Sequence, residues 1–216
     1  MSTLKIITAG ESVLVCFLPP PAALPKQRRL WAFADAAQTL PHVAEVVTGM
    51  NNVTVFARPQ ADLNNLSDGL YRLWEKTETG DHQGRHVDIP VCYGGEFGED
   101  LAEVAAFHHT TPEEIVRRHT EPAYTVFMVG FQPGFPYLGG LPENLHTPRR
   151  AVPRTQVPAG SVGIGGSQTG IYPFASPGGW QIIGRTEIPL FQTASHPPTL
   201  LSAGDTVRFV AERICL

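Results

Sequence analysis

Cysteine and charge are scarce in this sequence. Its 216 residues contain only three cysteines, Cys16, Cys92 and Cys215, and no CxxC pair. An odd and scattered set argues against a disulfide framework and is typical of a reducing cytosol. Charged residues make up 17% of the chain and the formal net charge is -4, so the composition gives no support for a nucleic-acid-binding surface.

Long apolar runs are also missing. The early run at residues 13–18 is too short for the core of a signal peptide, and a polar turn at residues 10–12 precedes it. No stretch approaches the length needed to cross a membrane. We therefore expect a cytoplasmic protein that makes no contact with a membrane.

The common catalytic signatures are absent as well. The Gly-rich stretch at 159–170, AGSVGIGGSQTG, lacks the Gly-Lys-Ser/Thr ending of a P-loop. Gln168 stands where G-x-G-x-x-G needs its third Gly, and Thr169 stands where G-x-S-x-G needs its last. A Ser/Lys amidase site is excluded because no lysine follows Lys76, and no Cys/His cluster has zinc spacing. The sequence therefore identifies no catalytic residue and no metal ligand.

Residues 1–80 are expected to form a small α+β domain. Apolar spacing predicts a strand-strand-helix order that occurs twice, which is typical of a small α/β sandwich. The expected elements are strands within 4–18 and 42–59, turns at 10–12 and 49–52, a helix over 25–40, and a second helix with its apolar stripe at Leu63, Leu66, Leu70 and Leu73.

A polar segment at 78–86 is expected to link this domain to a second one. His82 and His86 within it have an H-x3-H spacing that metal sites use. Gly84 lies between them and argues against a helix that would hold a metal, so we expect a solvated loop.

The second domain, residues 86–216, shows many short apolar segments between Gly and Pro turns. Strands are expected at 86–94 and 124–131, with another near the end of the chain. Two helices are expected between the first two strands, and Thr111, followed by Pro and then Glu, predicts the start of the second helix. This pattern favours a closed barrel or a sandwich.

A Gly-rich and locally basic segment is the best candidate for a site. Residues 130–180 hold 11 of the 21 Gly and 8 of the 20 Pro, and Glu143 is the only carboxylate between Pro122 and Thr186. Backbone N–H groups in Gly turns and Arg side chains suit a small anion. Phe131, Phe135, Tyr137 and Trp180 would form its apolar walls. The alternative is a loop-rich barrel whose Arg residues are solvated or cap strand ends.

Other titratable side chains have structural interpretations. Glu96, Glu99 and Asp100 could pair as carboxylates, but acids at the start of a helix are favoured by the helix dipole. His108, His109 and His119 flank a predicted helix and are expected to be surface or packing residues. His146, inside the basic segment, stays a site candidate.

Four long motifs carry a resemblance to a known family. They are GFQPGFPYLGGLP, TPRRAVPR, VPAGSVGIGGSQTGIYPFASPGGW and IPVCYGGEFGEDL. They resemble the family of 5-oxoprolinase B subunits. This family is also called the KipI-like family, the allophanate hydrolase subunit 1 family, or carboxyltransferase subdomains C and D. The resemblance covers nearly the whole chain. It implies a small α/β sandwich domain followed by a cyclophilin-like β-barrel domain.

The resemblance also implies partners and a reaction. Members pair with a C-type 5-oxoprolinase partner, and an A-type protein completes the enzyme. The assembly opens 5-oxo-L-proline to L-glutamate while hydrolysing ATP, and phosphorylation is thought to activate the lactam. ATP with Mg²⁺ would be bound in the assembled complex, with no cofactor on this chain alone. We expect one component of an ATP-hydrolysing 5-oxoprolinase, inactive without its partners.

The resemblance gives each candidate residue a role. Arg side chains would bind the substrate carboxylate or phosphates, Gly amides would cradle an anion, Gln side chains would bond an amide, and the Pro-Gly-Phe-Pro segment would be a rigid wall or a partner-docking bend. The candidates are Phe131, Gln132, Gly134, Phe135, His146, Arg149, Arg150, Arg154, Gly163, Gly165, Gly166, Gln168 and Trp180.

Two other functions remain open at this stage. Some relatives act as regulatory binding proteins that inhibit a sensor histidine kinase, and such a role would not need the Arg and Gly-rich site. The same domain also occurs in the urea and allophanate pathway, and the sequence separates these substrates only weakly.

Overall fold

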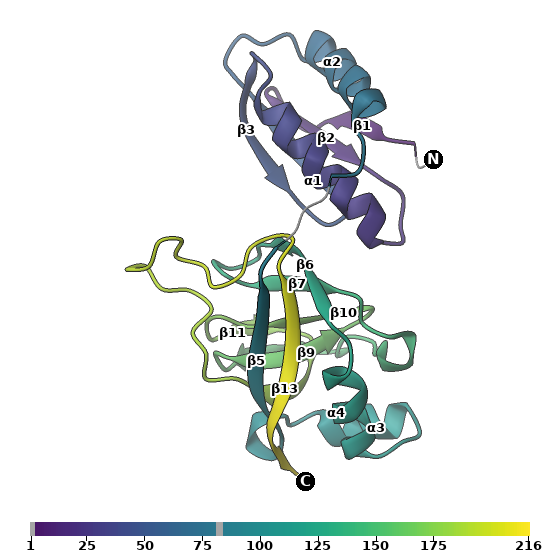
Figure 1. Cartoon of the computed structure of the whole chain (residues 1–216), viewed down its shortest axis with the longest axis vertical. Coiled ribbons are helices and arrows are strands. Elements are labelled where there is room, and N and C mark those ends of the chain that lie inside the picture. Colours follow the sequence, from purple (N-terminus) through teal and green to yellow (C-terminus); the bar gives the residue numbers. More distant parts are fainter. Residues whose placement is uncertain (1–2, 81–83) are drawn as a thin grey trace. The chain divides into compact units, whose positions relative to one another are not determined.

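The computed structural model describes residues 3–80 and 84–216. The chain divides into two compact units, Met1–His82 and Gln83–Leu216, which are described separately (Figure 1). The expected metal-free loop at His82 lies outside the described residues.

The first unit is a four-stranded antiparallel sheet covered by two helices. Its chain order is strand, strand, helix, repeated once, as the sequence predicts. The sheet order is β1-β2-β4-β3. The elements are β1 (Lys5–Thr8), β2 (Val13–Phe17), α1 (Leu24–Gln38), β3 (Val43–Thr48), β4 (Asn52–Ala57) and α2 (Leu63–Lys76).

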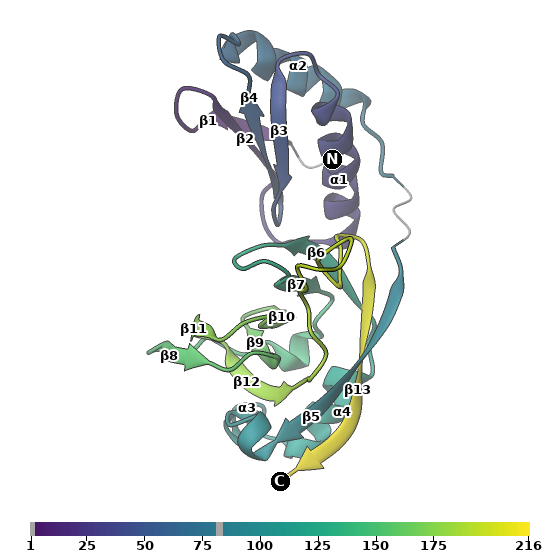
Figure 2. The ribbon, with the colours of Figure 1, turned by 90° about the vertical axis from the view of Figure 1, so that its left-hand side faces the viewer.

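Both helices pack on one face of this sheet (Figure 2). Alternate strand residues such as Leu14 and Val55 point to that face, because side chains along a strand alternate between its two sides. Phe33 of α1 meets Trp74 of α2 edge to face, with ring centroids 5.5 Å apart. In α2 the apolar stripe ends on the buried Trp74, while Leu73 is only partly buried.

The hairpin turn at 49–52 is tied to α1 by a buried polar side chain. Gln27 is fully buried and donates from Nε2 to the carbonyl of Gly49 at 2.9 Å. Its Oε1 accepts from the N–H of Asn51 at 3.1 Å. Asn51 has φ of 59°, a conformation that Asn tolerates better than most residues. A helix side chain therefore satisfies the backbone of the turn that joins β3 to β4.

The second unit contains a closed barrel, which settles the choice between barrel and sandwich. Neighbouring strands follow the order β10-β7-β6-β13-β5-β12-β9, and β10 pairs with β9 to close the ring. A separate two-stranded sheet is formed by β8 (Arg154–Val157) and β11 (Ser176–Gly178). The barrel strands are β5 (His86–Gly94), β6 (Tyr124–Val129), β7 (Pro136–Gly139), β9 (Ser161–Gly165), β10 (Gln168–Ile171), β12 (Gln181–Arg185) and β13 (Thr206–Cys215).

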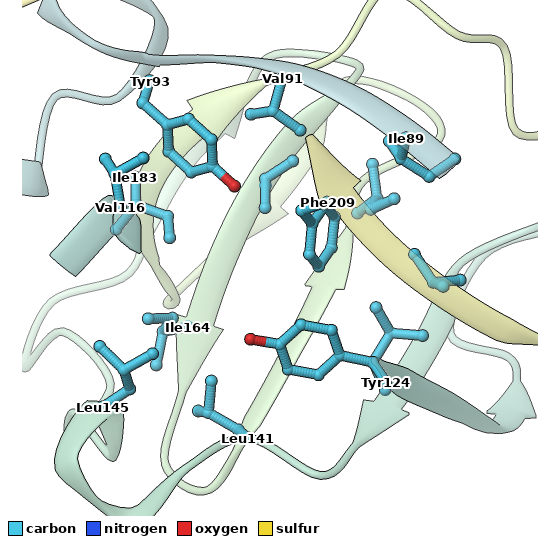
Figure 3. Packing of buried hydrophobic residues seen from close by; sticks show 14 of the residues in the cluster. Ile89, Val91, Tyr93, Val116, Tyr124, Leu141, Leu145, Ile164, Ile183 and Phe209 are labelled. Carbon is cyan, nitrogen blue, oxygen red and sulfur yellow. The ribbon is translucent and has the colours of Figure 1, made fainter. Parts of the chain in front are cut away.

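Two helices between β5 and β6 add to the barrel core. Buried side chains of α3 (Leu101–Phe107) and α4 (Pro112–Thr120) join the cluster that Ile89, Tyr124 and Phe209 form inside the barrel (Figure 3). As the sequence predicts, Thr111 caps α4, and its hydroxyl accepts from the N–H of Glu114 at 3.3 Å. Short 3₁₀ turns lie at Gly95–Phe97 and Glu143–Leu145.

Candidate ligand-binding site

Aromatic side chains line a pocket of about 320 Å³ beside the barrel, which we call the aromatic pocket. They meet edge to face, as aromatic pairs prefer: Phe135 lies 5.2 Å from Tyr172 and 5.5 Å from Trp180 between ring centroids. Such walls suit a small ligand with an apolar part. The aromatic residues are Phe131, Phe135, Tyr137, Tyr172 and Trp180.

The loop before β7 holds the rim of this pocket in a fixed shape. Phe131 has φ of 68°, which is uncommon for a bulky residue and costs about 1–3 kcal/mol. Hydrogen bonds over-determine the loop, because Phe135 donates to the carbonyl of Gln132 at 3.0 Å and Gly130 donates to that of Phe135 at 3.0 Å. Gly134 has φ of 85°, and a Cβ there would lie 2.9 Å from the carbonyl oxygen of Leu190. The loop therefore presents Phe131, which is 62% exposed, as a preset rim.

The glycines of the segment make room for these rings. A Cβ on Gly165 would lie 2.5 Å from Nε1 of Trp180, and one on Gly178 would lie 2.6 Å from the hydroxyl of Tyr172. Gly163 and Gly165 lie within β9, which pairs with β10 and β12 on its two sides, and Gly166 exchanges backbone hydrogen bonds with Thr147. The backbones of Gly163 and Gly165 therefore belong to the barrel and pack against Trp180, whereas Gly166 lies just beyond β9 with open space beside it. The expected cradle of amides facing an anion stays a prediction.

The three arginines of the basic segment have different surroundings. Arg149 is exposed, lines the aromatic pocket, and lies 5.8 Å from the centroid of the Trp180 ring. Arg150 and Arg154 instead bond to Asp100, at 2.7 Å for Arg150 Nη1 and at 2.7 and 2.9 Å for Arg154. Arg149 is thus the exposed arginine of this set, while Arg150 and Arg154 are partly buried.

Asp100 is buried, with 2% of its surface exposed, and shares its one negative charge between these two arginines. It precedes α3, as expected, but its carboxylate does not cap that helix. One oxygen, Oδ2, accepts from the N–H of Ile182 in β12 at 2.6 Å. The hydrogen bond to Asp100 raises the pKa of Arg154 above its ordinary value. Asp100 therefore lies at the start of α3, as expected, and in addition ties the segment 149–154 to the barrel.

A second and larger hollow lies on the other side of Arg149. It has a volume of about 520 Å³ between α3 and residues 147–152, and we call it the α3 pocket. Arg149 and Arg150 line both hollows. The side chain of Phe107 at its wall is half exposed. Sequence reasoning missed this hollow because it counted Phe107 only as a helix residue.

Comparison with known proteins identifies the family of this chain. Residues 4–201 match the model of the carboxyltransferase domain, subdomain C and D. The chain belongs to this family. This confirms the resemblance carried by the four sequence motifs.

Two curated relatives of this carboxyltransferase-domain protein have the same name. The 5-oxoprolinase B subunit of Haemophilus influenzae is 61% identical over 211 residues, which cover 98% of this chain and 99% of the relative. The 5-oxoprolinase B subunit of Escherichia coli O157:H7 is 49% identical, with 99% and 98% covered. The name subunit implies that these relatives work within a larger complex.

A solved structure shows the same fold inside a longer protein. The crystal structure of TTHA0988 matches 93% of this chain with a TM-score of 0.79 and 34% identity. The chain spans only 40% of TTHA0988. In that protein the fold is joined to further polypeptide.

The remaining candidates of this carboxyltransferase domain lie around the pocket rather than in it. Among the described residues, the lining of the aromatic pocket contains neither Gln132, Gln168 nor His146. Gln168 lies in β10 opposite Gly165, and His146 Nε2 bonds to the carbonyl of Leu141 at 3.0 Å. Tyr172 is a wall residue of the aromatic pocket that the sequence reasoning missed. The feature that could have identified it is the presence of two aromatic residues, Tyr172 and Phe174, just after the Gly-rich stretch at 159–170.

Two histidines of this domain have structural roles, and His119 is the clearer case. His119 is fully buried, and burial lowers its pKa to about 3. His108 bonds to the hydroxyl of Thr147 at 3.0 Å, and partial burial lowers its pKa. Within the described ranges, no three His, Cys, Asp or Glu side chains are close enough to hold a metal ion. None of the described helices is long and apolar enough to span a membrane.

Proposed function

We propose that this chain is one component of an ATP-dependent 5-oxoprolinase, which converts 5-oxo-L-proline to L-glutamate with hydrolysis of ATP. The observation that carries the proposal is the near-complete match to relatives named as the B subunit of 5-oxoprolinase, at 61% and 49% identity. The site around Arg149 supports it, because an exposed guanidinium between two hollows suits a small anionic substrate. The proposed location is the cytoplasm.

The chemistry needs positioning and charge neutralisation more than a protein nucleophile. A lactam resists hydrolysis, and a phosphoryl group on its oxygen makes it a better electrophile. Phosphoryl transfer depends on fixed cations and excluded water. In this chain Arg149 would neutralise substrate charge, and the aromatic walls would exclude water. Arg150 and Arg154 act through Asp100 as positioning residues for that segment.

The rest of the enzyme would come from other chains. Mg²⁺ prefers carboxylate and water oxygens, and the described part of this chain offers no cluster of three acidic or histidine ligands. We therefore assign the Mg²⁺ ligands to a C-type partner, with ATP bound in the assembled complex and an A-type protein opening the ring. The longer polypeptide of TTHA0988 supports a fold that works beside further chain.

The test is ATP hydrolysis that depends on 5-oxo-L-proline. It is measured for this chain alone, with the C-type partner, and with the A-type protein added. We expect substrate-dependent turnover only in the complete mixture, and a loss of at least about tenfold in kcat/KM for Arg149→Ala, since one charge-assisted contact is worth about 1.5–3 kcal/mol. The matched control is Arg72→Ala, an exposed arginine on α2, which should stay within about twofold.

Other outcomes point to the other functions. Turnover with urea or allophanate instead of 5-oxo-L-proline would replace the substrate. Stable assembly without turnover, together with inhibition of a sensor histidine kinase by Arg149→Ala as strong as by the wild type, would show a regulatory protein.

A further inference from the structure

Tyr137 carries an accessible hydroxyl in the wall of the aromatic pocket. It lies on β7 next to Leu138, which points into the barrel core. Because side chains alternate along a strand, Tyr137 points to the outer side, where it packs with Phe135 and Trp180. Among the described residues its hydroxyl has no hydrogen-bond partner, and the oxygen is not buried. This hydroxyl is therefore available to a ligand.

Arg149 is the second polar group that this pocket offers. Its side chain is exposed, and within the described part of the chain it takes part in no ion pair. Arg150 also lines the pocket, but it is paired with the buried Asp100 at 2.7 Å. No carboxylate belongs to the described lining. The aromatic pocket therefore presents one positive charge without a partner.

The charge of Arg149 acts on both phenols of the pocket. Partial burial raises the pKa of Tyr137 above its ordinary value, and the guanidinium of Arg149 opposes that rise. Burial also raises the pKa of Tyr172, whose oxygen accepts a hydrogen bond from the backbone of Trp180. Tyr172 is thus used within the chain, whereas the hydroxyl of Tyr137 keeps its proton at neutral pH and can donate it to an anion.

We propose that Arg149 and Tyr137 together bind the carboxylate of the substrate in the aromatic pocket, an inference that rests on the proposed 5-oxoprolinase activity. One carboxylate oxygen accepts from the guanidinium of Arg149, and the other accepts from the hydroxyl of Tyr137. The ring of 5-oxo-L-proline packs on the aromatic walls. Tyr137 is thus a specificity-determining residue, which favours a small ring that bears a carboxylate.

The charge and the size of the pocket favour a small monocarboxylate. One free positive charge matches one carboxylate, whereas the triphosphate of ATP carries several negative charges and is normally neutralised by metal ions and several cations. A volume of about 320 Å³ is at the lower end for ligand pockets, which suits a single small ring. Urea has no carboxylate and would leave both donors without a charged partner.

Binding of small ligands to the full chain tests the role of the carboxylate. In NMR spectra, the indole N–H signal of Trp180 should shift with 5-oxo-L-proline and with cyclopentanecarboxylate, which keeps the ring and the carboxylate without the lactam. 2-Pyrrolidinone keeps the lactam and lacks the carboxylate, so it should bind at least about tenfold more weakly. The indole signals of Trp31 and Trp74 in the first unit are internal controls. Equal affinity for 2-pyrrolidinone, or no shift with any ligand, would overturn the proposal.

Tyr137→Phe isolates the hydroxyl, because it removes one oxygen and keeps the ring. We expect the Kd for 5-oxo-L-proline to rise about tenfold and the Kd for 2-pyrrolidinone to change less than about twofold. In the assembled complex the KM for 5-oxo-L-proline should rise by a similar factor, with the KM for ATP unchanged. Tyr71→Phe, which removes a hydroxyl from the partly exposed Tyr71 of α2, is the matched control. An equal loss of affinity for both ligands would indicate altered packing and contradict the proposal.

These outcomes separate the carboxylate site from the proposed activity. If the complex shows no turnover but the Trp180 signal responds to the carboxylate, the site stands and the proposed activity fails. If the complex turns over and Tyr137→Phe leaves the KM for 5-oxo-L-proline unchanged, the proposed activity stands and the site fails.

Discussion

Tyr93 donates a hydrogen bond of 2.8 Å to Nδ1 of His119 in the middle of the barrel. On the other side of the ring, Nε2 meets the hydroxyl of Thr169 at 2.9 Å, and that hydroxyl donates to the carbonyl of Gly163. Because the Thr169 proton is already used, Nε2 must carry the imidazole proton and Nδ1 must accept. A neutral histidine of fixed tautomer therefore links β5, α4, β10 and β9 through the core.

This histidine gives the protein an acid-sensitive fold. In the folded state His119 stays neutral until pH falls to about 3, whereas its ordinary pKa is 6.5. The unfolded chain therefore binds a proton first. Its contribution to stability is complete above pH 6.5 and is lost as pH falls toward 3, at about 1.4 kcal/mol per pH unit.

His119→Gln isolates that contribution, because Gln keeps one donor and one acceptor but does not titrate. Urea unfolding between pH 7 and 4 should show a steeper loss of stability for the wild type than for His119→Gln. Carboxylates contribute equally to both proteins and cancel in the comparison. Equal slopes would show that His119 is not the group responsible.

Gly165→Ala tests the packing role of the glycines. The added Cβ would lie 2.5 Å from the Trp180 ring, inside van der Waals contact. Overpacking of this kind costs about 1–3 kcal/mol, so we expect a lower midpoint in chemical denaturation and a shifted Trp fluorescence spectrum. Gly69→Ala in α2 is the control, since nothing lies within 4 Å of its Cβ. It should stabilise the helix by about 0.5–1 kcal/mol. Equal effects at both positions would refute the packing role.

Asp100→Asn tests the anchor of the basic segment. The substitution leaves Arg150 and Arg154 facing a neutral amide in place of a carboxylate. Loss of one partner of a buried ion pair lowers the free energy of unfolding by about 3–5 kcal/mol. We expect lower thermal stability and weaker 5-oxo-L-proline-dependent activity in the assembled complex. Glu99→Gln is the control because Glu99 is largely exposed and its ion pair with Arg154 is worth under about 1 kcal/mol. Wild-type stability of Asp100→Asn would show that the anchor is unimportant.

Local signals account for most of the predicted elements. The strand-strand-helix repeat, the turn at 49–52 and the cap at Thr111 depend on side-chain period and turn chemistry, which act over a few residues. The sequence also predicted the aromatic walls at Phe131, Phe135 and Trp180. Aromatic side chains in a segment rich in Gly and Pro favour a ligand site, because such a segment forms no regular helix. The motifs that carry the resemblance are contiguous, so the family could be recognised without coordinates.

Tertiary structure alone decided which of these residues are available to a ligand. Asp100 and Arg154 are 54 positions apart, and only closure of the barrel brings the buried acid to a segment that looks uniformly basic along the chain. The same closure places the Trp180 ring over Gly165 and leaves Arg149 exposed between the two hollows. The sequence determines the local backbone conformation and which side-chain groups are present. Long-range pairing in a closed sheet determines which charges cancel and which remain for binding, because burial and charge partners depend on the fold as a whole.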